Sequence, residues 1–523
     1  MNIFSKLSKN TPTEPKISSQ DYIYEKLKTI KTSSNIFFNG SVIDKVFINN
    51  SGVIKRTLLL GKQRIQILLF YMEGMVNSDF LSQNIIDPIV KLKDLVIIKE
   101  NLSPGYIKES VITPSSVDEA STFDVIIYEL LSGSTILFVD GLAKCFIIAN
   151  KGIKGRSVDK PDSEQTIRGA KYAFVENIDT NVILIRTMLK TPDLAVETLN
   201  IGKRTKTSIA LIYLKGVINK DLPEAVKNQI DKINIDGIVD SSQIHYLIQK
   251  HKWTLFPQIL TTERIDRTIS TLLDGRCVII VDGSPFVLIL PTTFDLFLST
   301  PDDYYGKSII TSLLRIIRYM VFFEACTISA LYLALTTYNP GLIPTSLVLS
   351  ITGSRVGLPF PVVIEILLME ITLYLIQEAA IRLPKVVGQT VGIVGGLVIG
   401  QAVVQAGIVS PIIVIIVSMS AISSFTLPNY VFALSTIAIR LFLIFCSSIL
   451  GLYGFVMGLM FILIHAASLE NLGVKYLSKY SPYNKEELKD SVIIAPLHTM
   501  HKRPAYLKTE DTVKSRNDTK DDT

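Results

Sequence analysis

A run of 22 residues without a charged side chain, Val386-Val-Gly-Gln-Thr-Val-Gly-Ile-Val-Gly-Gly-Leu-Val-Ile-Gly-Gln-Ala-Val-Val-Gln-Ala-Gly407, lies in the C-terminal half of the chain. It is long enough to cross a bilayer, which takes ~20 apolar residues in a helix. The same character extends to both sides, because residues 308–470 hold only 11 of the 100 Asp, Glu, Lys and Arg residues. With a mean hydropathy of +0.38, this pattern excludes a wholly soluble enzyme and a disordered chain. It predicts a soluble α/β region followed by an all-α polytopic transmembrane domain over 308–470.

Six apolar segments are predicted in this domain, over 313–337, 361–380, 387–407, 411–427, 430–449 and 452–469. The fourth and fifth are short and closely spaced, so a re-entrant pair over 411–449 is the alternative to two complete crossings. Cytoplasmic flanks of membrane helices are enriched in lysine and arginine. Basic residues gather before the first segment, between the second and third, and after the last, whereas the opposite side carries little besides Arg355. Both terminal regions are therefore predicted to be cytoplasmic.

The N-terminal part of the chain contains an internal repeat. Residues Gln66–Asp79 resemble Ser208–Asp221, and Leu130–Gly141 resemble Leu272–Gly283. Both matches have an offset of 142 residues, which two chance similarities would not share. Short β-branched runs bounded by Gly and Asp indicate strands. The predicted order is a flexible segment (1–29), two duplicated α/β subdomains (30–155 and 156–300), the membrane domain (308–470) and a cytoplasmic, partly disordered tail (471–523).

Few residues in the soluble part point to chemistry. Asp140-Gly141 and Asp282-Gly283 close the repeats, and this dipeptide suits a turn with positive φ, so we favour turns over a functional carboxylate pair. No phosphate-binding loop, nucleophile elbow, metalloprotease or kinase motif occurs, and the four cysteines have no metal-binding spacing. The net charge of +6 is not clustered as nucleic-acid binding requires. We expect neither an enzyme nor a bound cofactor, metal or nucleic acid.

Charged residues inside the apolar segments are costly, and by default they indicate function. Glu378 and Arg382 are four residues apart on one predicted helix, which is sufficient for a local ion pair. Arg440 stands among apolar residues and should pair with a carboxylate, either Glu365 or Glu370. Those two glutamates are five residues apart, about 140° around a helix, so they point in different directions. One could pair with Arg440 while the other faces an aqueous cavity; a purely structural pair is the alternative.

The third segment has two distinct faces. Glycines at four-residue spacing let neighbouring helices approach closely, and they are Gly388, Gly392, Gly396 and Gly400. A second stripe is apolar at one end and carries amides at the other; it consists of Val394, Val398, Gln401 and Gln405. In an oligomer this stripe could line a pore that opens by wetting and passes ions with little chemical selection. The alternative is a helix buried in a monomeric bundle whose two glutamines bond to its neighbours.

These segments resemble the A subunits of GerA-type spore germinant receptors. The resemblance covers about residues 30–510 and includes a Pro359-Phe360-Pro361 motif. Family members usually have an acidic residue after the arginine that precedes this motif, whereas Val356 follows Arg355 here, which argues against a charge pair in this outer loop. The other motifs that carry the resemblance are Glu365-Ile-Leu-Leu-Met-Glu370, Gln377-Glu-Ala-Ala-Ile-Arg-Leu-Pro384, Gly388–Pro411, Ser424-Phe-Thr-Leu-Pro-Asn-Tyr430, Gly451-Leu-Tyr-Gly454, Pro301-Asp-Asp-Tyr-Tyr305 and Arg503-Pro504.

The resemblance implies a function that the residues alone do not give. Such A subunits lie in the inner membrane of dormant endospores together with a transporter-like B subunit and a lipoprotein C subunit. They are thought to oligomerise, as a pentamer, into a nutrient-gated channel for monovalent cations, and the family's pore assignment favours the third segment. A secondary transporter subunit, or a non-conducting membrane scaffold for the B subunit, is the alternative. Nutrient binding by the soluble subdomains is a third, weaker possibility.

Overall fold

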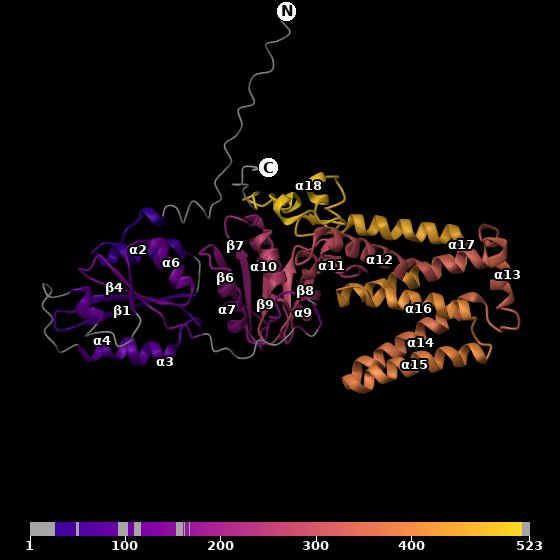
Figure 1. Cartoon of the computed structure of the whole chain (residues 1–523), viewed down its shortest axis with the longest axis horizontal. Coiled ribbons are helices and arrows are strands. Elements are labelled where there is room, and N and C mark those ends of the chain that lie inside the picture. Colours follow the sequence, from indigo (N-terminus) through magenta and orange to yellow (C-terminus); the bar gives the residue numbers. More distant parts are fainter. Residues whose placement is uncertain are drawn as a thin grey trace, which may run out of the picture.

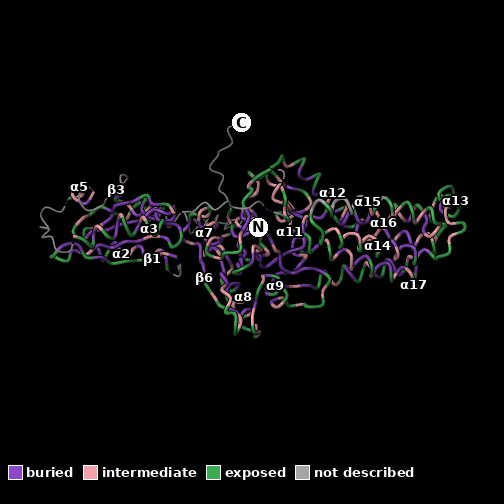
Figure 2. The backbone as a smooth tube through the Cα atoms, turned by 90° about the horizontal axis from the view of Figure 1, so that it is seen from below, coloured by how far each residue is buried: buried purple, intermediate pink, exposed green. Residues whose placement is uncertain are grey.

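The computed structural model is elongated, with two α/β units and a helical region in a row (Figure 1). It describes residues 27–48, 52–92, 103–108, 117–152, 161, 163–166 and 168–514. The predicted flexible segment 1–29 lies almost wholly outside these residues. Buried residues are most concentrated in the sheets, whereas buried, intermediate and exposed residues alternate along the helices (Figure 2).

The first unit is a five-stranded antiparallel sheet between two layers of helices. Its strand order is β1-β2-β4-β5-β3. The strands are β1 (Val53–Leu60), β2 (Ile65–Met72), β3 (Val117–Ala120), β4 (Thr135–Val139) and β5 (Cys145–Ile148). One face is covered by α2 (Ile36–Val46) and α6 (Phe123–Leu131), and the other by α3 (Ser78–Leu81) and α4 (Asp87–Lys91). Because both faces are covered, central strands such as β4 are apolar at nearly every position.

The second unit repeats this arrangement, with strand order β6-β7-β9-β10-β8. The strands are β6 (Leu194–Ile201), β7 (Thr207–Leu214), β8 (Leu260–Thr262), β9 (Cys277–Val281) and β10 (Val287–Leu290). The covering helices are α7 (Ile178–Met188) and α10 (Ile265–Leu273) on one face, and α8 (Asp221–Asp231) and α9 (Ser241–Ile248) on the other. Strands β7 and β9 begin 142 residues after β2 and β4, so the repeat found in the sequence is present in the structure.

The two Asp-Gly pairs lie in turns. Each follows a central strand, β4 or β9, and leads into the hairpin to β5 or β10. Gly141 and Gly283 have φ of +94° and +86°, a region that residues with a Cβ rarely adopt. The Asp282 carboxylate accepts a hydrogen bond from the backbone N–H of Ile178, at 3.3 Å, near the start of α7. These aspartates therefore shape turns, as the sequence indicates.

The core of the second unit continues into the helical region without a break. Helix α11 (Phe294–Leu298) places Phe294 and Phe297 against the helices. The Phe297 ring stacks on Phe432, with ring centroids 5.4 Å apart, and Phe432 stacks on Phe322 at 5.1 Å. This shared apolar core fixes the helices to the second unit.

The helical region contains six helices in the part of the chain that the structure describes: α12 (Ser308–Thr337), α13 (Thr345–Gly353), α14 (Val362–Arg382), α15 (Lys385–Gln405), α16 (Pro411–Phe425) and α17 (Tyr430–Ser468). Helix α13 falls between the first two predicted segments and was not expected. Helices α14 and α15 form a hairpin that diverges from the others at its end nearer the sheets (Figure 1). The tail is folded against the second unit as far as Lys514, although the sequence predicts partial disorder there.

Helix α17 is two helices that fold back on each other. Gly451 has φ 59° and ψ −133°, outside the helical region. Beyond it the chain reverses: the Phe442 and Phe461 rings lie 5.7 Å apart, and a Cβ on Gly458 would lie 3.3 Å from the Cys446 Cβ. Such contacts are impossible in a straight helix, where 19 residues span about 28 Å. The two halves correspond to the predicted fifth and sixth segments.

Among the described residues, two helices are long and apolar enough to cross a membrane, α12 and α17, judged by length and composition alone. Helix α16 is apolar but has only 15 residues. The prediction of a polytopic domain with six crossings therefore stays a prediction.

Gly451→Ala is expected to lower the thermal unfolding midpoint of the full chain in detergent. The backbone angles favour glycine, and a Cβ would lie 2.7 Å from the Cβ and Cγ of Tyr338. Strained backbone of this kind costs about 1–3 kcal/mol. Gly353→Ala is the matched control, because in the part of the chain that the structure describes no atom beyond the local helix backbone lies within 4 Å of the added Cβ. Equal midpoints for the two variants would contradict the proposed reversal at Gly451.

Candidate functional site: buried charge clusters on helix α12

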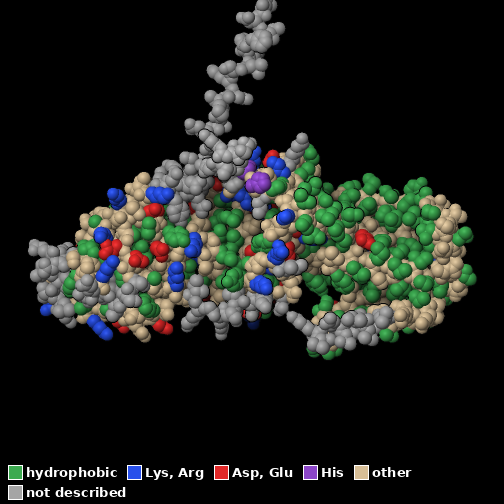
Figure 3. Space-filling model, in the orientation of Figure 1, with side chains coloured by type: hydrophobic (Ala, Val, Ile, Leu, Met, Phe, Trp, Pro, Cys, Tyr) green, Lys and Arg blue, Asp and Glu red, His purple; other side chains and the backbone are tan. Residues whose placement is uncertain are grey.

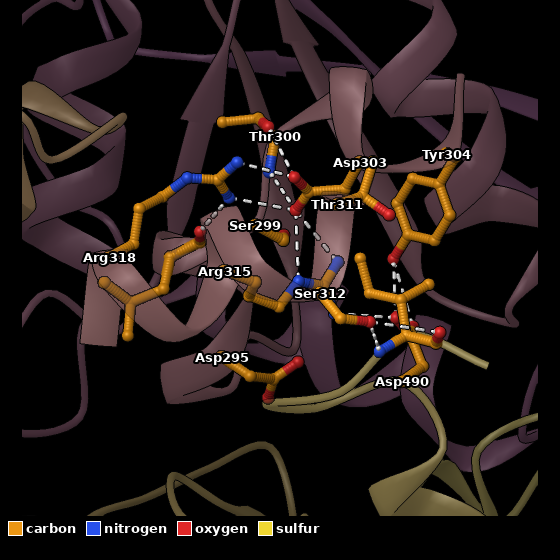
Figure 4. Close-up of polar contacts among 12 residues, drawn as sticks. Asp295, Ser299, Thr300, Asp303, Tyr304, Thr311, Ser312, Arg315, Arg318 and Asp490 are labelled. Carbon is orange, nitrogen blue, oxygen red and sulfur yellow. Dashed lines mark hydrogen bonds and ion pairs between the residues drawn. The ribbon is translucent and has the colours of Figure 1, made fainter. Parts of the chain in front are cut away.

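A buried charge cluster joins the second α/β unit, α12 and the tail; we call it the junction cluster (Figure 4). Its centre is Asp303, in the short 3-10 helix η5 (Pro301–Tyr304), with a side chain only 1% exposed. Arg315 Nη2 lies 3.0 Å from Asp303 Oδ2, and Arg318 Nη2 lies 2.5 Å from Oδ1. Because the two arginines are three residues apart on α12, they reach the carboxylate from one helix face.

Local sequence explains why Asp303 is fixed in this position. Thr300 and Asp303 form a capping box, in which the Thr300 backbone N–H and hydroxyl both donate to the carboxylate, at 3.2 and 3.1 Å. Pro301 occupies the first turn, where its missing N–H costs nothing. Burial by itself raises the pKa of Asp303, but the Arg318 hydrogen bond and the charges of Arg315 and Arg318 outweigh it and hold the pKa below its usual value.

The tail contributes the second layer of the junction cluster. Asp490 accepts hydrogen bonds from Arg315 Nη1 at 2.9 Å and from the Tyr304 hydroxyl at 3.0 Å. Lys479 Nζ lies 2.7 Å from an Asp295 oxygen and 3.6 Å from Asp490. Burial would lower the pKa of Lys479, yet these two carboxylates hold it well above its usual value. The positive and negative charges neutralise one another only while the second α/β unit, α12 and the tail stay in contact. Separation of any of the three would leave a buried charge without a partner.

A second buried cluster lies among the helices; we call it the bundle cluster. Arg440 Nη2 lies 3.1 Å from Glu370 Oε2, and both side chains are at most 2% exposed. Arg440 Nη1 also donates to the Ala325 carbonyl at 2.9 Å, and the Ser329 hydroxyl donates to Glu370 at 3.2 Å. Of the two partners predicted for Arg440, the structure selects Glu370. Tyr374, on the same helix as Glu370, contacts the guanidinium through its hydroxyl.

Glu365 has a different environment. Its side chain is fully buried, accepts a hydrogen bond from the Ser410 backbone N–H at 2.9 Å and lies 3.4 Å from Arg355 Nη2. Of the two alternatives left open for the second glutamate, this environment matches the structural one, and the carboxylate pairs with Arg355. The acid comes from α14 instead of the outer loop. Pro361, of the Pro359-Phe360-Pro361 motif, is the N-cap residue of α14.

Glu378 and Arg382 form the predicted local pair, with Arg382 Nε 2.7 Å from Glu378 Oε1. Their side chains are 58% and 77% exposed. This pair therefore differs from the two buried clusters. Its charges are exposed and screened, so the pair contributes at most about 1 kcal/mol to the stability of the folded chain.

The stripe predicted on α15 points outward. Val398 is 55% exposed, and Gln401 and Gln405 are exposed too. The side chain of Val394 lies outside the described residues. The structure thus places three members of the stripe on the surface of a single chain, away from the interior of a monomeric bundle.

The glycine face of α15 is close to a neighbour at one end only. A Cβ on Gly388 would lie 2.4 Å from the Ala380 carbonyl oxygen of α14, whereas among the described residues no atom beyond the local helix backbone lies within 4 Å of one on Gly396. Gly400 faces Val414 at 3.8 Å. The surroundings of Gly392 lie outside the described residues. Close helix packing along the whole ladder would need a partner beyond this chain, so that role stays a prediction.

The junction cluster was not predicted from the sequence. Arg315 and Arg318 served only as topology markers, and Pro301-Asp-Asp-Tyr-Tyr305 only as a family motif. An arginine pair 12 and 15 residues after the acidic residue of a capping box is a signal that could have linked α12 to η5. Asp490 follows Arg315 by 175 residues, and no local pattern connects them.

Comparisons with known proteins agree along nearly the whole chain. A family model described as Bacillus/Clostridium GerA spore germination protein matches residues 41–506. Spore germination protein KA of Bacillus subtilis is 36% identical over 523 residues, covering 99% of this chain and 96% of that relative. Spore germination protein GerLA of Bacillus cereus is 38% identical over 402 residues, covering 77% and 82%. The crystal structure of the N-terminal domain of the A subunit of the Bacillus megaterium spore germinant receptor GerK3 aligns with a TM-score of 0.39 and 29% identity, covering 51% of this chain and 98% of that one.

Proposed function

The chain belongs to the Bacillus/Clostridium GerA family of spore germination proteins, and we propose that it is a membrane subunit of a nutrient-sensing germinant receptor. In this proposal several copies, five according to the family resemblance, surround a path for monovalent cations in the spore inner membrane. Nutrient binding at a transporter-like B subunit opens the path, and a lipoprotein C subunit completes the complex.

Insertion of the helical region into a bilayer is supported by its surface. Hydrophobic side chains cover this end of the molecule, while charged side chains gather over the α/β units (Figure 3). On α17 the large side chains Tyr453, Met457 and Ile464 are 81%, 66% and 65% exposed. An apolar surface of this extent is typical of a membrane or a protein interface. Each half of α17 is about 25–30 Å long, close to the hydrocarbon thickness of ~30 Å.

The observation that carries the pore proposal is the exposure of the α15 amides. Gln401 and Gln405 are exposed at the end of α15, after a stretch over 391–400 that has only apolar residues and glycine. An amide facing lipid loses its hydrogen bonds to water, which is costly, whereas a water path between copies would satisfy it. Val398, one turn earlier, would then provide the apolar constriction that opens by wetting.

Helix α12 provides a mechanical link from the soluble units to the bundle. Its first turns carry Arg315 of the junction cluster, and further along it carries Ala325 and Ser329 of the bundle cluster. A shift of α12 relative to the second unit would break the ion pairs of Arg315 and Arg318 with Asp303. A shift of α12 relative to α14 and α17 would break its hydrogen bonds to the bundle cluster. Packed elements with buried pairs switch between discrete arrangements, so a partner subunit that biases α12 would bias the path.

Flux through the purified chain in liposomes tests this proposal against its rivals. Flux of K⁺ that depends only on the ion gradient supports a channel. Flux coupled to a nutrient gradient would instead favour a secondary transporter, and no flux would favour a scaffold for the B subunit. The transporter reading is weakened by the pairing of Glu365 and Glu370 with arginines, because a coupling site needs a carboxylate that can exchange partners.

Val398→Ala and Val394→Ala are expected to make spores germinate without nutrient. Each change removes two methyl groups, about 1.5 kcal/mol of apolar contact per copy, so the constriction wets more easily. Val403→Ala is the control, because Val403 packs on the core and lies off the stripe. The measurement is the fraction of spores that germinate in buffer. Normal dormancy in both stripe variants would show that the stripe does not form the gate.

A further inference from the structure

The single tryptophan of the chain stands on an exposed loop beside the end of α17. Trp253 is 98% exposed and Leu255 is 37% exposed. Lys250 and Lys252 are exposed as well. A large aromatic side chain with almost no contacts of its own is unusual in a folded unit, because tryptophan is normally well buried.

The loop is tied to the base of α17 by two contacts. The Thr254 hydroxyl hydrogen bonds with His465 Nε2 at 2.9 Å. The Phe256 ring stacks on the His465 imidazole, with ring centroids 6.3 Å apart. Since α17 ends at Ser468, Trp253 and Leu255 are held within one helical turn of the point where the helix ends.

The loop is attached where the exposed surface of the neighbouring helices is apolar. Exposed apolar side chains of α17 extend as far as Ile464. On α12, Tyr319 lines the same apolar cavity of about 310 Å³ as Phe256 and Ala466. Exposed apolar side chains also continue along α12 toward its first residue, where Ile317 is 43% and Ile309 is 86% exposed. The loop is therefore attached beside helix surface that is apolar on both α12 and α17.

We propose that the loop Lys250–Leu255 anchors the second α/β unit to the membrane interface. Trp253 and Leu255 enter the headgroup region of the bilayer beside the end of α17, and the ammonium groups of Lys250 and Lys252 contact anionic phospholipid headgroups. Tryptophan is enriched at this depth because its ring is apolar and its N–H still finds a partner, and basic residues are attracted by anionic lipid. The inference rests on the proposed membrane insertion of the helices.

Because Trp253 is the only tryptophan, its fluorescence tests the proposal without a label. The full chain is reconstituted into vesicles of phosphatidylcholine with a minority of phosphatidylglycerol, with and without bromine on the acyl chains. We expect blue-shifted emission, loss of most of the intensity in brominated vesicles, and protection from iodide in the buffer. Quenching of Trp253 by iodide, with no loss of its fluorescence in brominated vesicles, would overturn the proposal. The same result is expected if the loop instead binds a partner protein, which these vesicles do not contain.

Two relocated tryptophans separate this inference from membrane insertion itself. W253F/F445W places the tryptophan on α17, where Phe445 is 63% exposed, and W253F/F37W places it in the first unit, where Phe37 is 70% exposed. The first should be quenched by brominated lipid and the second by iodide. If position 445 is quenched by brominated lipid while Trp253 is not, the anchor is wrong and the membrane domain stands. If position 445 is not quenched by brominated lipid, membrane insertion fails.

A separate experiment tests whether Lys250 and Lys252 bind anionic lipid. When bromine is carried only by phosphatidylglycerol, quenching of Trp253 should exceed that expected from the share of this lipid, because the lysines enrich it locally. K250Q/K252Q should abolish the excess. Equal excess in the variant, or none in the natural chain, would overturn the role of Lys250 and Lys252.

Discussion

Arg440→Ala is expected to cause the largest loss of folded protein of any single change in the helices. The substitution leaves Glu370 buried with only hydroxyl donors, those of Ser329 at 3.2 Å, Ser420 at 3.4 Å and Tyr374, and no positive charge. Removing one partner of a buried ion pair costs about 3–5 kcal/mol, because the remaining charge is neither solvated nor neutralised. The measurements are the level of the protein in spore membranes and its thermal midpoint in detergent.

Two further variants make this test specific. Arg382→Ala breaks a pair of the same residue types, but it is exposed, so a cost of at most about 1 kcal/mol is expected. Removing both partners, as in R440M/E370L, should recover much of the stability lost in R440A, because no uncompensated charge remains. An Arg440→Ala chain that accumulated and melted like the natural protein would contradict the bundle cluster.

Asp303→Asn is expected to loosen α12 from the soluble part. The carboxylate is the shared partner of Arg315 and Arg318 and is almost fully buried. Its neutral replacement leaves Arg318 without an opposite charge in contact, at a cost of about 3 kcal/mol. Amide hydrogen exchange should accelerate in the first turns of α12, and the thermal midpoint should fall.

Asp44→Asn is the control for Asp303. Asp44 pairs with Lys55 at 2.6 Å, but both side chains are about half exposed, so little change is expected. If exchange in the first turns of α12 were the same in Asp303→Asn as in the natural chain, the junction cluster would not hold this helix.

The stabilisation provided by Asp303 should depend on pH in a defined direction. Its pKa is lowered in the folded chain, because the arginines outweigh the effect of burial. A carboxyl group whose pKa is lower in the folded chain stabilises that chain fully at pH values above its pKa in the unfolded chain. This stabilisation is lost as the pH falls through its pKa in the folded chain. The difference in midpoint between the natural chain and Asp303→Asn should therefore shrink in acid. A difference independent of pH would assign the effect to packing alone.

Patterns of short period were enough to predict part of this architecture. The β-branched runs ending in Asp-Gly predicted strands, and the 142-residue offset predicted that the α/β subdomain would be repeated. The spacing of Glu378 and Arg382 fixed their pair, because residues four apart on a helix are always neighbours. The apolar runs located the helices, although α13, in a run too short to stand out, was missed.

Other features depend on contacts between segments far apart in the chain. Arg440 had two candidate acids on α14, and only the rotation of that helix, set by its packing, selected Glu370 and gave Glu365 to Arg355. The junction cluster needed a tail residue to meet α12.

The amino-acid sequence by itself determined whether each segment is a strand or a helix and whether it is apolar or polar. These properties follow from patterns that repeat every two to four residues, so residues close together in the sequence decide them. Which buried charges meet, where α17 reverses and which side of α15 stays uncovered were decided only by the tertiary structure. Those outcomes depend on how whole elements pack, and the same local pattern is compatible with several packings.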